Sequence, residues 1–264
     1  MKDLLSFDGW DRKIIEELIS HTAKIKKSPE KYYNALKNKT MLMIFEKPSL
    51  RTRLSFEVGM TQLGGHAIYL DVKDSPLGEK ESIEDTAKVS SRYCDIIMAR
   101  MFEHDNIIKL AKNSAVPVIN GLTNTFHPCQ ILSDLFTIHE KKKKLKGIKL
   151  AFVGDGNNNI THSLLEGCSI VGTDISVGSP KQHSPQQWIV NNAKSNAKKS
   201  GSKITITDDA KKAVENADIV YADTWMSYHI PKEQKQERIK IFQPYQVNKN
   251  LMNNAKKDAL FMNC

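Results

Sequence analysis

The sequence lacks the features that define several classes of protein. It has no apolar stretch near the ~20 residues that a membrane helix requires, and residues 1–9 carry no long apolar run typical of a secretory signal. Its four cysteines include no C-x-x-C pair, which argues against a disulfide framework and against a zinc finger. We therefore expect a soluble cytoplasmic protein with reduced thiols and no membrane partner.

Aromatic residues are scarce, at 7% of the chain, and they do not accompany its positive charge. The formal net charge is +9, and residues 141–264 hold all of the excess, with 20 Lys and Arg against 11 Asp and Glu. Apart from one run at residues 141–144 the lysines are scattered, without the interleaved aromatic rings that stack on bases. We interpret this charge as a solvated surface rather than as a nucleic-acid interface, whose retention on DNA would depend steeply on salt.

Short apolar runs alternate with amphipathic stretches along the whole chain, which is typical of parallel α/β sheets. We predict strands at residues 41–45, 67–70, 96–99, 116–119, 149–153, 175–177, 204–207, 219–222 and 260–262. We predict helices at residues 54–63, 82–93, 127–140, 162–170, 185–199, 211–216 and 232–242.

A polar run at residues 141–147 interrupts this alternation. It predicts a linker between two domains, one covering residues 1–140 and the other residues 148–264. The expected fold class is α/β, with each domain a mainly parallel sheet flanked by helices.

Unusual polar residues gather where predicted strands give way to helices, the place where open α/β sheets bind ligands. Residues 49–53 read Ser-Leu-Arg-Thr-Arg, so hydroxyl and guanidinium groups that suit a phosphate stand at a helix N-terminus. Arg100 ends the third predicted strand, and residues 127–130 read His-Pro-Cys-Gln at the start of a helix. His127 and Gln130 are a candidate donor pair for a carbonyl oxygen.

A fourth junction, residues 154–159, reads Gly-Asp-Gly-Asn-Asn-Asn after an apolar strand. It begins like a dinucleotide fingerprint but lacks the third glycine, and no acidic residue ends the next strand. A dinucleotide site is therefore the weaker interpretation, and the sequence points to no metal either.

The segments at residues 49–53 and 127–130 resemble the carbamoyl phosphate signatures of the aspartate/ornithine carbamoyltransferase family. Four further segments narrow the resemblance to the ornithine branch: 45–48 (Phe-Glu-Lys-Pro), 154–158, 223–227 (Asp-Thr-Trp-Met-Ser) and 261–264 (Phe-Met-Asn-Cys). The resemblance covers essentially the whole chain in order.

The resemblance implies that the first domain binds carbamoyl phosphate and the second binds ornithine, with the reaction in the cleft between them. By similarity the carbamoyl phosphate ligands are Ser49, the backbone N–H of Leu50, Arg51, Thr52, Arg100, His127 and Gln130. The ornithine ligands are Asn159, Asp223, Ser227 and Tyr228. The catalytic set is Arg51, Arg100, His127, Asp223 and Cys264.

The implied reaction is attack of the neutral δ-amine of ornithine on the carbonyl carbon, giving citrulline and phosphate in arginine biosynthesis. The family resemblance implies a homotrimer and neither a metal nor another cofactor. Tyr228 and His229 stand where Met-Gly is usual, which keeps open a sister enzyme with another amine acceptor. Family members continue past Cys264 into terminal helices, so we also expect a truncated chain whose activity is low, or a non-catalytic homologue.

Overall fold

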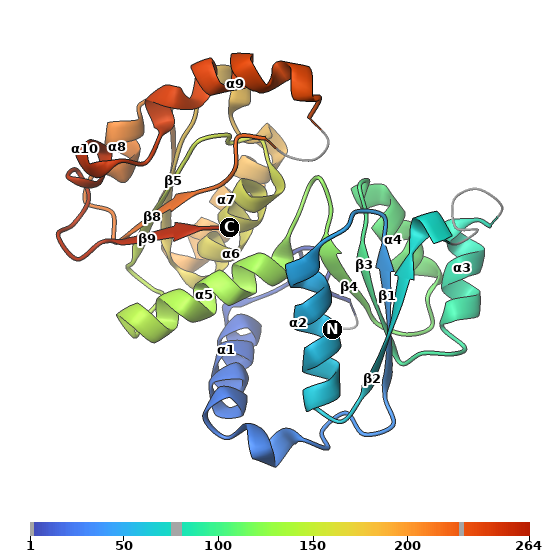
Figure 1. The fold of residues 1–264 in the computed structure, drawn as a ribbon. Helices are drawn as coiled ribbons and strands as arrows, with labels where there is room; N and C mark the ends of the chain where they lie inside the picture. The colour runs from blue at the N-terminus through green and yellow to red at the C-terminus, as the bar shows by residue number, and fades with distance from the viewer. Residues whose placement is uncertain (1–2, 75–80, 227–229) are drawn as a thin grey trace. The chain divides into compact units, whose positions relative to one another are not determined.

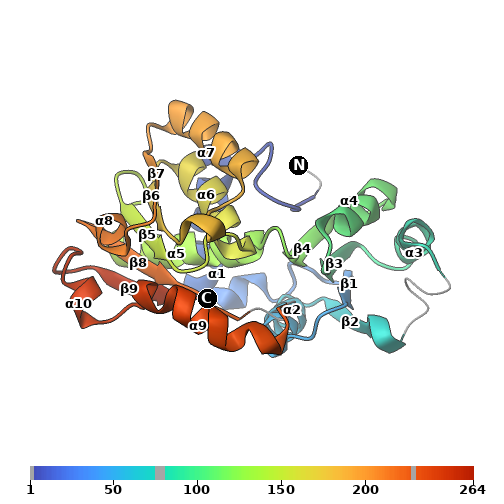
Figure 2. The same cartoon turned by 90° about the horizontal axis from the view of Figure 1, so that it is seen from above.

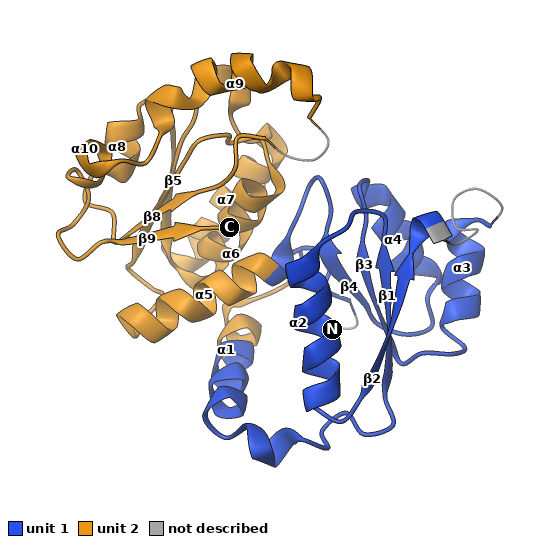
Figure 3. Cartoon of the chain, viewed as in Figure 1, with its two compact units in different colours: residues 1–8, 17–129 blue, residues 9–16, 130–264 orange. Residues whose placement is uncertain are grey.

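A computed structural model describes residues 3–74, 81–226 and 230–264 of the protein. The chain divides into two compact units, one of residues 1–8 and 17–129 and the other of residues 9–16 and 130–264 (Figure 3). Each unit holds one parallel sheet with helices, so the predicted α/β class is confirmed. Across the described ranges, the helices include none with the length and apolar character needed to span a bilayer.

The first unit contains a four-stranded parallel sheet in the order β2-β1-β3-β4 (Figure 1). Its strands are β1 (Thr40–Phe45), β2 (His66–Asp71), β3 (Ile96–Arg100) and β4 (Val118–Leu122). Its helices are α2 (Leu50–Gln62), α3 (Ile83–Ser90), α4 (His104–Asn113) and most of α1 (Arg12–Lys27), with short 3₁₀ turns at Pro29–Tyr32 and Val72–Asp74.

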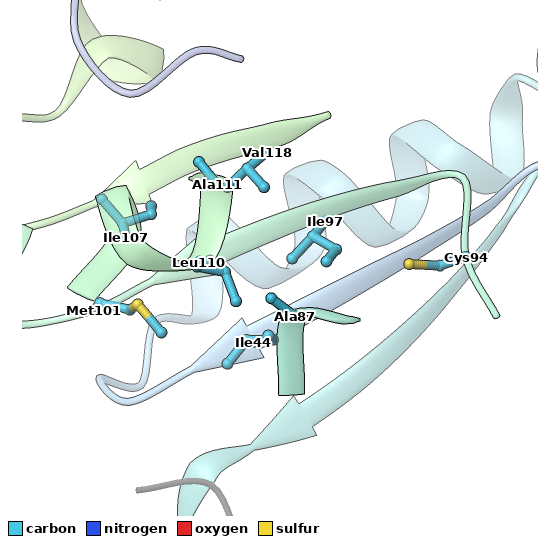
Figure 4. Close-up of a cluster of buried hydrophobic side chains, with 10 residues drawn as sticks. Ile44, Ala87, Cys94, Ile97, Met101, Ile107, Leu110, Ala111 and Val118 are labelled. Atoms are coloured by element: carbon cyan, nitrogen blue, oxygen red, sulfur yellow. The ribbon is translucent and has the colours of Figure 1, made fainter. Parts of the chain in front are cut away.

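Successive side chains along the strands of this sheet point to opposite faces, so each face has its own hydrophobic core. Ile44 and Ile97 meet Ala87 of α3 and Leu110 of α4 in a fully buried cluster (Figure 4). A second cluster, rich in methionine, lies on the opposite face and packs against α2. Its members are Met41, Met43, Phe45, Met60 and Met98. Burial on both faces explains why the strands read as short apolar runs.

The second unit contains a five-stranded parallel sheet in the order β7-β6-β5-β8-β9. Its strands are β5 (Lys149–Val153), β6 (Asp174–Gly178), β7 (Ile204–Thr207), β8 (Ile219–Ala222) and β9 (Leu260–Asn263). Its helices are α5 (Pro128–Lys142), α6 (Asn159–Val171), α7 (Gln187–Ser200), α8 (Ala210–Val214), α9 (Lys235–Phe242) and α10 (Lys249–Met252), with 3₁₀ turns at Lys181–His183, Lys232–Gln234 and Gln243–Tyr245.

Helices α6 and α7 of this unit lie side by side (Figure 2). Every residue of α6 after its first is buried, including the polar side chains of His162 and Glu166, so this helix lies inside the unit with no solvent-exposed face. On the other face of the sheet, Val153 and Val220 pack with Val214 of α8 and Leu251 of α10. The sheet is thus covered on both sides, as a parallel sheet requires.

Most predicted elements are confirmed to within a few residues, and four need correction. Helices α1, α4 and α10 are absent from the sequence prediction, although α4 carries the apolar spacing Ile107, Leu110, Ala111. The strand predicted at residues 116–119 lies at Val118–Leu122 instead, because Ser114 holds both the N–H and the C=O of Val116 in a local turn.

The predicted linker at residues 141–147 does not coincide with the division between the two compact units. Helix α5 continues to Lys142, and it is grouped with the second unit from residue 130 onward. The chain turns out of the helix at Lys143, which has a φ of 60°, and again at Gly147, with a φ of 75°. The break in the pattern therefore coincides with the end of α5, and the division into domains at residues 141–147 stays a prediction.

Candidate active site

The first candidate site lies in the first unit, where β1 leads into α2. Ser49 caps this helix with extended backbone, and its Oγ accepts a hydrogen bond from the Thr52 N–H at 3.4 Å. The Thr52 hydroxyl accepts hydrogen bonds from Ser49 Oγ at 3.0 Å and from Arg100 Nη1 at 3.2 Å. Since both of its lone pairs are used, the Thr52 hydroxyl can act toward a further group only as a donor.

Sheet order explains how Arg100 reaches that loop across the sequence. Strand β3 pairs with β1, and the register places Arg100 opposite Phe45, the last residue of β1. The pairing of β3 with β4 shifts between Ala99 and Arg100, an irregularity of the kind that re-aims a side chain beside a site. Two of the expected phosphate ligands, Thr52 and Arg100, are therefore in direct contact.

Buried positive charge surrounds the next expected ligand, His127. The exposed fractions of Lys47, Arg100 and His127 are only 4%, 6% and 8%. Burial, together with the charges of Arg100 and Lys47, lowers the pKa of His127 to about 3, so its imidazole is neutral at physiological pH. A neutral imidazole offers one N–H donor, and the two cations beside it favour a ligand with negative charge.

The loop that carries His127 is fixed by hydrogen bonds behind it. The Thr123 N–H donates to the Phe126 carbonyl at 2.8 Å. The amide of Asn120, which is fully buried, donates to the same carbonyl at 3.3 Å and to the Leu5 carbonyl at 2.8 Å. These bonds hold the backbone next to His127 before any ligand arrives.

The two arginines of the Ser-Leu-Arg-Thr-Arg segment have different surroundings. Arg53 lies over the Tyr69 ring, 3.9 Å from its centroid, and its Nε donates to Glu57 at 2.9 Å. Arg51 is exposed on the first turn of α2. Arg51 thus lies at the helix N-terminus, while Arg53 supports the helix and the neighbouring strand.

The second unit gathers expected ornithine ligands at three adjacent strand ends. The register aligns Val153 of β5, Ala222 of β8 and Asn263 of β9. Asn159 begins α6 after β5, while Asp223 and Cys264 directly follow β8 and β9. The expected ligands Ser227 and Tyr228 lie outside the residues that the structure describes.

A buried ion pair, which the sequence reasoning missed, supports these loops. Arg238 of α9 binds the Asp155 carboxylate, and both side chains are about nine-tenths buried. The Arg238 Nε also donates to the Trp225 carbonyl at 2.6 Å. Arg238 thus joins the loop after β5 to the segment after β8, a role that nothing in the local pattern around residue 238 indicated.

A second buried carboxylate, Asp134, lies on α5 four residues after Gln130. Its Oδ1 accepts a hydrogen bond from Gln130 Nε2 at 3.1 Å, and its Oδ2 accepts one from the Tyr221 hydroxyl at 2.8 Å. Burial raises the pKa of Asp134 to about 6, because desolvation outweighs these two hydrogen bonds. The sequence does contain a signal for this buried carboxylate, because Asp134 lies within the apolar helical spacing of Ile131, Leu135 and Ile138.

Comparison with protein families assigns both units of the chain to one family. Residues 2–140 match the model of the aspartate/ornithine carbamoyltransferase carbamoyl-P binding domain. Residues 146–264 match the model of the Asp/Orn binding domain of the same family. The chain belongs to the aspartate/ornithine carbamoyltransferase family.

Individual carbamoyltransferases agree with this assignment. The chain is 48% identical to the ornithine carbamoyltransferase of Bacillus subtilis (strain 168), over 100% of this chain and 81% of the relative. It is 45% identical to a protein named catabolic ornithine carbamoyltransferase of Thermoplasma volcanium, over 95% of this chain and 81% of that one. The solved ornithine carbamoyltransferase of Pyrococcus furiosus superposes with a TM-score of 0.94 at 45% identity, over 100% of this chain and 84% of that one.

The charged side chains of the two units are the groups that can bind the substrates of such a carbamoyltransferase. The first unit offers cations and the second offers carboxylates. Within residues 3–74, 81–226 and 230–264, no group of three or more His, Cys, Asp or Glu side chains is arranged to hold a metal ion. The four cysteines are not joined in disulfides; Cys94 and Cys168 are buried, and Cys264 is exposed.

Proposed function

We propose that the protein transfers the carbamoyl group of carbamoyl phosphate to the δ-amine of L-ornithine, giving L-citrulline and phosphate. The observation that carries the proposal is the cluster at the strand ends of the first unit, where Thr52 contacts Arg100 and buried cations flank His127. The relatives named ornithine carbamoyltransferase support the choice of ornithine.

On the carbamoyl phosphate side, the helix N-terminus and its side chains bind the phosphate. The N–H of Leu50 belongs to the first turn of α2, whose N–H groups have no partner within the helix. Ser49 and Thr52 add hydroxyl groups, and Arg51 adds a forked guanidinium. Arg100, His127 and Gln130 bind the carbamoyl group, and the first two stabilise the negative charge that develops on its oxygen.

On the ornithine side, the Asp223 carboxylate pairs with the cationic α-amino group. Asn159, Ser227 and Tyr228 complete the binding of ornithine, and Cys264 lies near the reacting δ-amine. The Asp223 Oδ1 accepts a hydrogen bond from the Thr224 N–H at 2.6 Å, which fixes one carboxylate oxygen. Its other oxygen is the one proposed to meet the ammonium.

The proposed step is a direct displacement at carbonyl carbon. The neutral δ-amine forms the new C–N bond, the carbonyl π electrons move onto oxygen, and the tetrahedral intermediate then expels phosphate as the amine loses a proton. No covalent bond to the protein is formed. Bringing two bound substrates into line can contribute about 7 to 11 kcal/mol to such a reaction.

We further propose the biological setting that the family suggests, which is a cytoplasmic homotrimer that acts in arginine biosynthesis. In each chain, residues 1–140 bind carbamoyl phosphate and residues 148–264 bind ornithine, with residues 141–147 as the linker. Support for association comes from α2, where Leu50, Leu54 and Val58 form an apolar row whose exposed fractions are 74%, 50% and 45%. Light scattering of the purified chain measures its mass directly, and a monomer at micromolar concentration would contradict the trimer.

The deciding experiment measures product formation by the purified chain with carbamoyl phosphate and each of four acceptors: ornithine, aspartate, putrescine and N-acetylornithine. Citrulline formed selectively from ornithine supports the proposal. Faster turnover of another acceptor favours the sister enzyme to which Tyr228 and His229 point. Silence with every acceptor, from a folded chain that still binds carbamoyl phosphate, favours a non-catalytic homologue.

A further inference from the structure

The part-buried hydrogen bond between Gln130 and Asp134 has a chemical consequence for substrate choice. A glutamine side chain ends in a carbonyl oxygen that accepts hydrogen bonds and an NH₂ group that donates them. Rotation of the amide by 180° exchanges the two, so an unrestrained glutamine can meet a ligand with either group. Gln130 is restrained, because its Nε2 donates to Asp134 Oδ1 at 3.1 Å.

An ionised carboxylate can enforce that orientation because it only accepts hydrogen bonds. With the NH₂ group held by Asp134, the Gln130 Oε1 is the atom left to face a ligand, so Gln130 acts as an acceptor and not as the donor partner of His127 that the sequence suggested. Asp134 is itself fixed, since it is 5% exposed and its second oxygen accepts from Tyr221 at 2.8 Å. Tyr221 is fully buried on β8, with its ring stacked against Phe152 at a centroid distance of 6.2 Å.

We propose that Asp134 is a positioning residue that fixes Gln130 as a hydrogen-bond acceptor, so that the site selects a phosphate ligand with an N–H₂ group on its carbonyl carbon. Carbamoyl phosphate has that group, whereas an acyl phosphate such as acetyl phosphate has a methyl group in the same place. The proposal rests on the proposed function, because it takes Gln130 to be a ligand of the carbamoyl group.

The test uses two stable ligands that differ only at this position. Phosphonoacetamide carries the amide NH₂, and acetonylphosphonate carries a methyl group instead. Titration calorimetry of the full chain gives a dissociation constant for each, and their ratio is the preference. We expect the wild type to prefer phosphonoacetamide. One lost hydrogen bond of about 1 to 1.5 kcal/mol corresponds to roughly a tenfold change in this preference.

Asp134→Asn keeps the shape of the side chain but adds an NH₂ group that can face the Gln130 oxygen and so permits the flipped amide. We expect its preference to fall about tenfold through weaker binding of phosphonoacetamide, with acetonylphosphonate unchanged. Asp218→Asn is the matched control in the same unit. Asp218 is 7% exposed and binds the Lys149 N–H at 2.8 Å and Lys256 Nζ at 2.7 Å, so its loss removes a comparable carboxylate and should leave the preference unchanged.

A double-mutant comparison separates positioning from a general loss of structure. In a Gln130→Ala background, which has no amide to orient, adding Asp134→Asn should leave the preference as it was. An unchanged preference in Asp134→Asn alone overturns the positioning role, and so does an equal loss in Asp218→Asn. Failure of the wild type to bind either phosphonate overturns the proposed function and this inference together, a result distinct from binding without a change in preference.

Discussion

The two units share one architecture but bury different charged groups. Both are parallel sheets whose polar residues follow the carboxyl ends of the strands. The first unit buries Lys47 and Arg100 beside a neutral imidazole, whereas the second buries Asp134, bonded to Gln130 and Tyr221, and the ion pair of Asp155 with Arg238. The buried cations of the first unit suit a phosphate, whereas the buried charged groups of the second are bound to neighbouring side chains and hold the structure around them in place.

This comparison also shows that the charge of a whole half of the chain is a poor guide to its site. Residues 1–140 hold 19 basic and 19 acidic residues, although this part contains the buried cations. Residues 141–264 are strongly basic, although the ornithine side relies on Asp223. The net charge is carried by solvated side chains, while substrate chemistry depends on the few charges that are buried or aimed at the site.

The largest expected effect on activity comes from removing the positive charge of Arg51 in the first unit. Arg51→Met should lower kcat/KM for carbamoyl phosphate by about 10²- to 10³-fold, because one aligned charged donor is lost. The melting temperature should stay near that of the wild type, since Arg51 is exposed. Steady-state kinetics and thermal melts measure both.

The matched control for this variant stands two residues along the same helix. Arg53→Met removes a guanidinium that lies over Tyr69 and pairs with Glu57. We expect kcat/KM for carbamoyl phosphate to change by less than about fivefold, since exposed ion pairs contribute about 0 to 1 kcal/mol. Equal losses in the two variants would show that the charge of the segment, not the position of Arg51, determines binding.

The next largest effect comes from breaking the buried ion pair of the second unit. Arg238→Met should lower the free energy of unfolding by about 3 to 5 kcal/mol, because it leaves Asp155 charged and buried. It should also raise KM for ornithine, since Arg238 joins the two loops that carry Asn159 and Asp223. Urea unfolding and kinetics measure these effects. Combining Arg238→Met with Asp155→Asn removes the uncompensated charge and should recover part of the stability but not the KM.

The pH dependence of the free energy of unfolding tests whether His127 in the first unit is buried as a neutral imidazole. The pKa of His127 is about 3 in the folded protein, whereas an unfolded chain protonates histidine near 6.5. Between these values the unfolded state binds more protons, so stability falls as the pH falls. From pH 6.5 to 4.5 this group should cost the wild type about 2 to 3 kcal/mol. His127→Gln should lose that much less stability over the same range in urea titrations, and parallel curves would contradict the buried neutral imidazole.

The smallest effect concerns glycines in the two units. Gly59 lies inside α2 with open space where a Cβ would stand, so Gly59→Ala should stabilise the protein by about 0.5 to 1 kcal/mol. At Gly156 an added Cβ would come within 2.7 Å of both the His183 carbonyl and Ser179 Oγ. Gly156→Ala should therefore destabilise the loop after β5. Thermal melts of the two variants should move in opposite directions.

Sequence patterns predicted the central strands well because burial on both faces makes strands such as β3 and β5 short apolar runs, and the edge strands β2, β7 and β9 still alternate partly buried apolar residues with exposed ones. They missed α1 and α4, although α4 carries the apolar spacing of Ile107, Leu110 and Ala111 and the Asp11 carboxylate accepts a hydrogen bond from the Ile14 N–H at the start of α1. They also placed β4 too early, because the hydrogen bonds of Ser114 that hold Val116 in a turn cannot be read from propensity.

The sequence by itself determined the α/β class and the places where chemistry concentrates, since strand periodicity and helix-capping residues are local properties. Tertiary structure alone decided which of the polar residues act together. Strand order brings Arg100 to Thr52 across 48 residues, and Arg238 reaches Asp155 across 83. Burial then decided the charge states of His127 and Asp134, because desolvation depends on everything packed around a group and not on its neighbours in sequence.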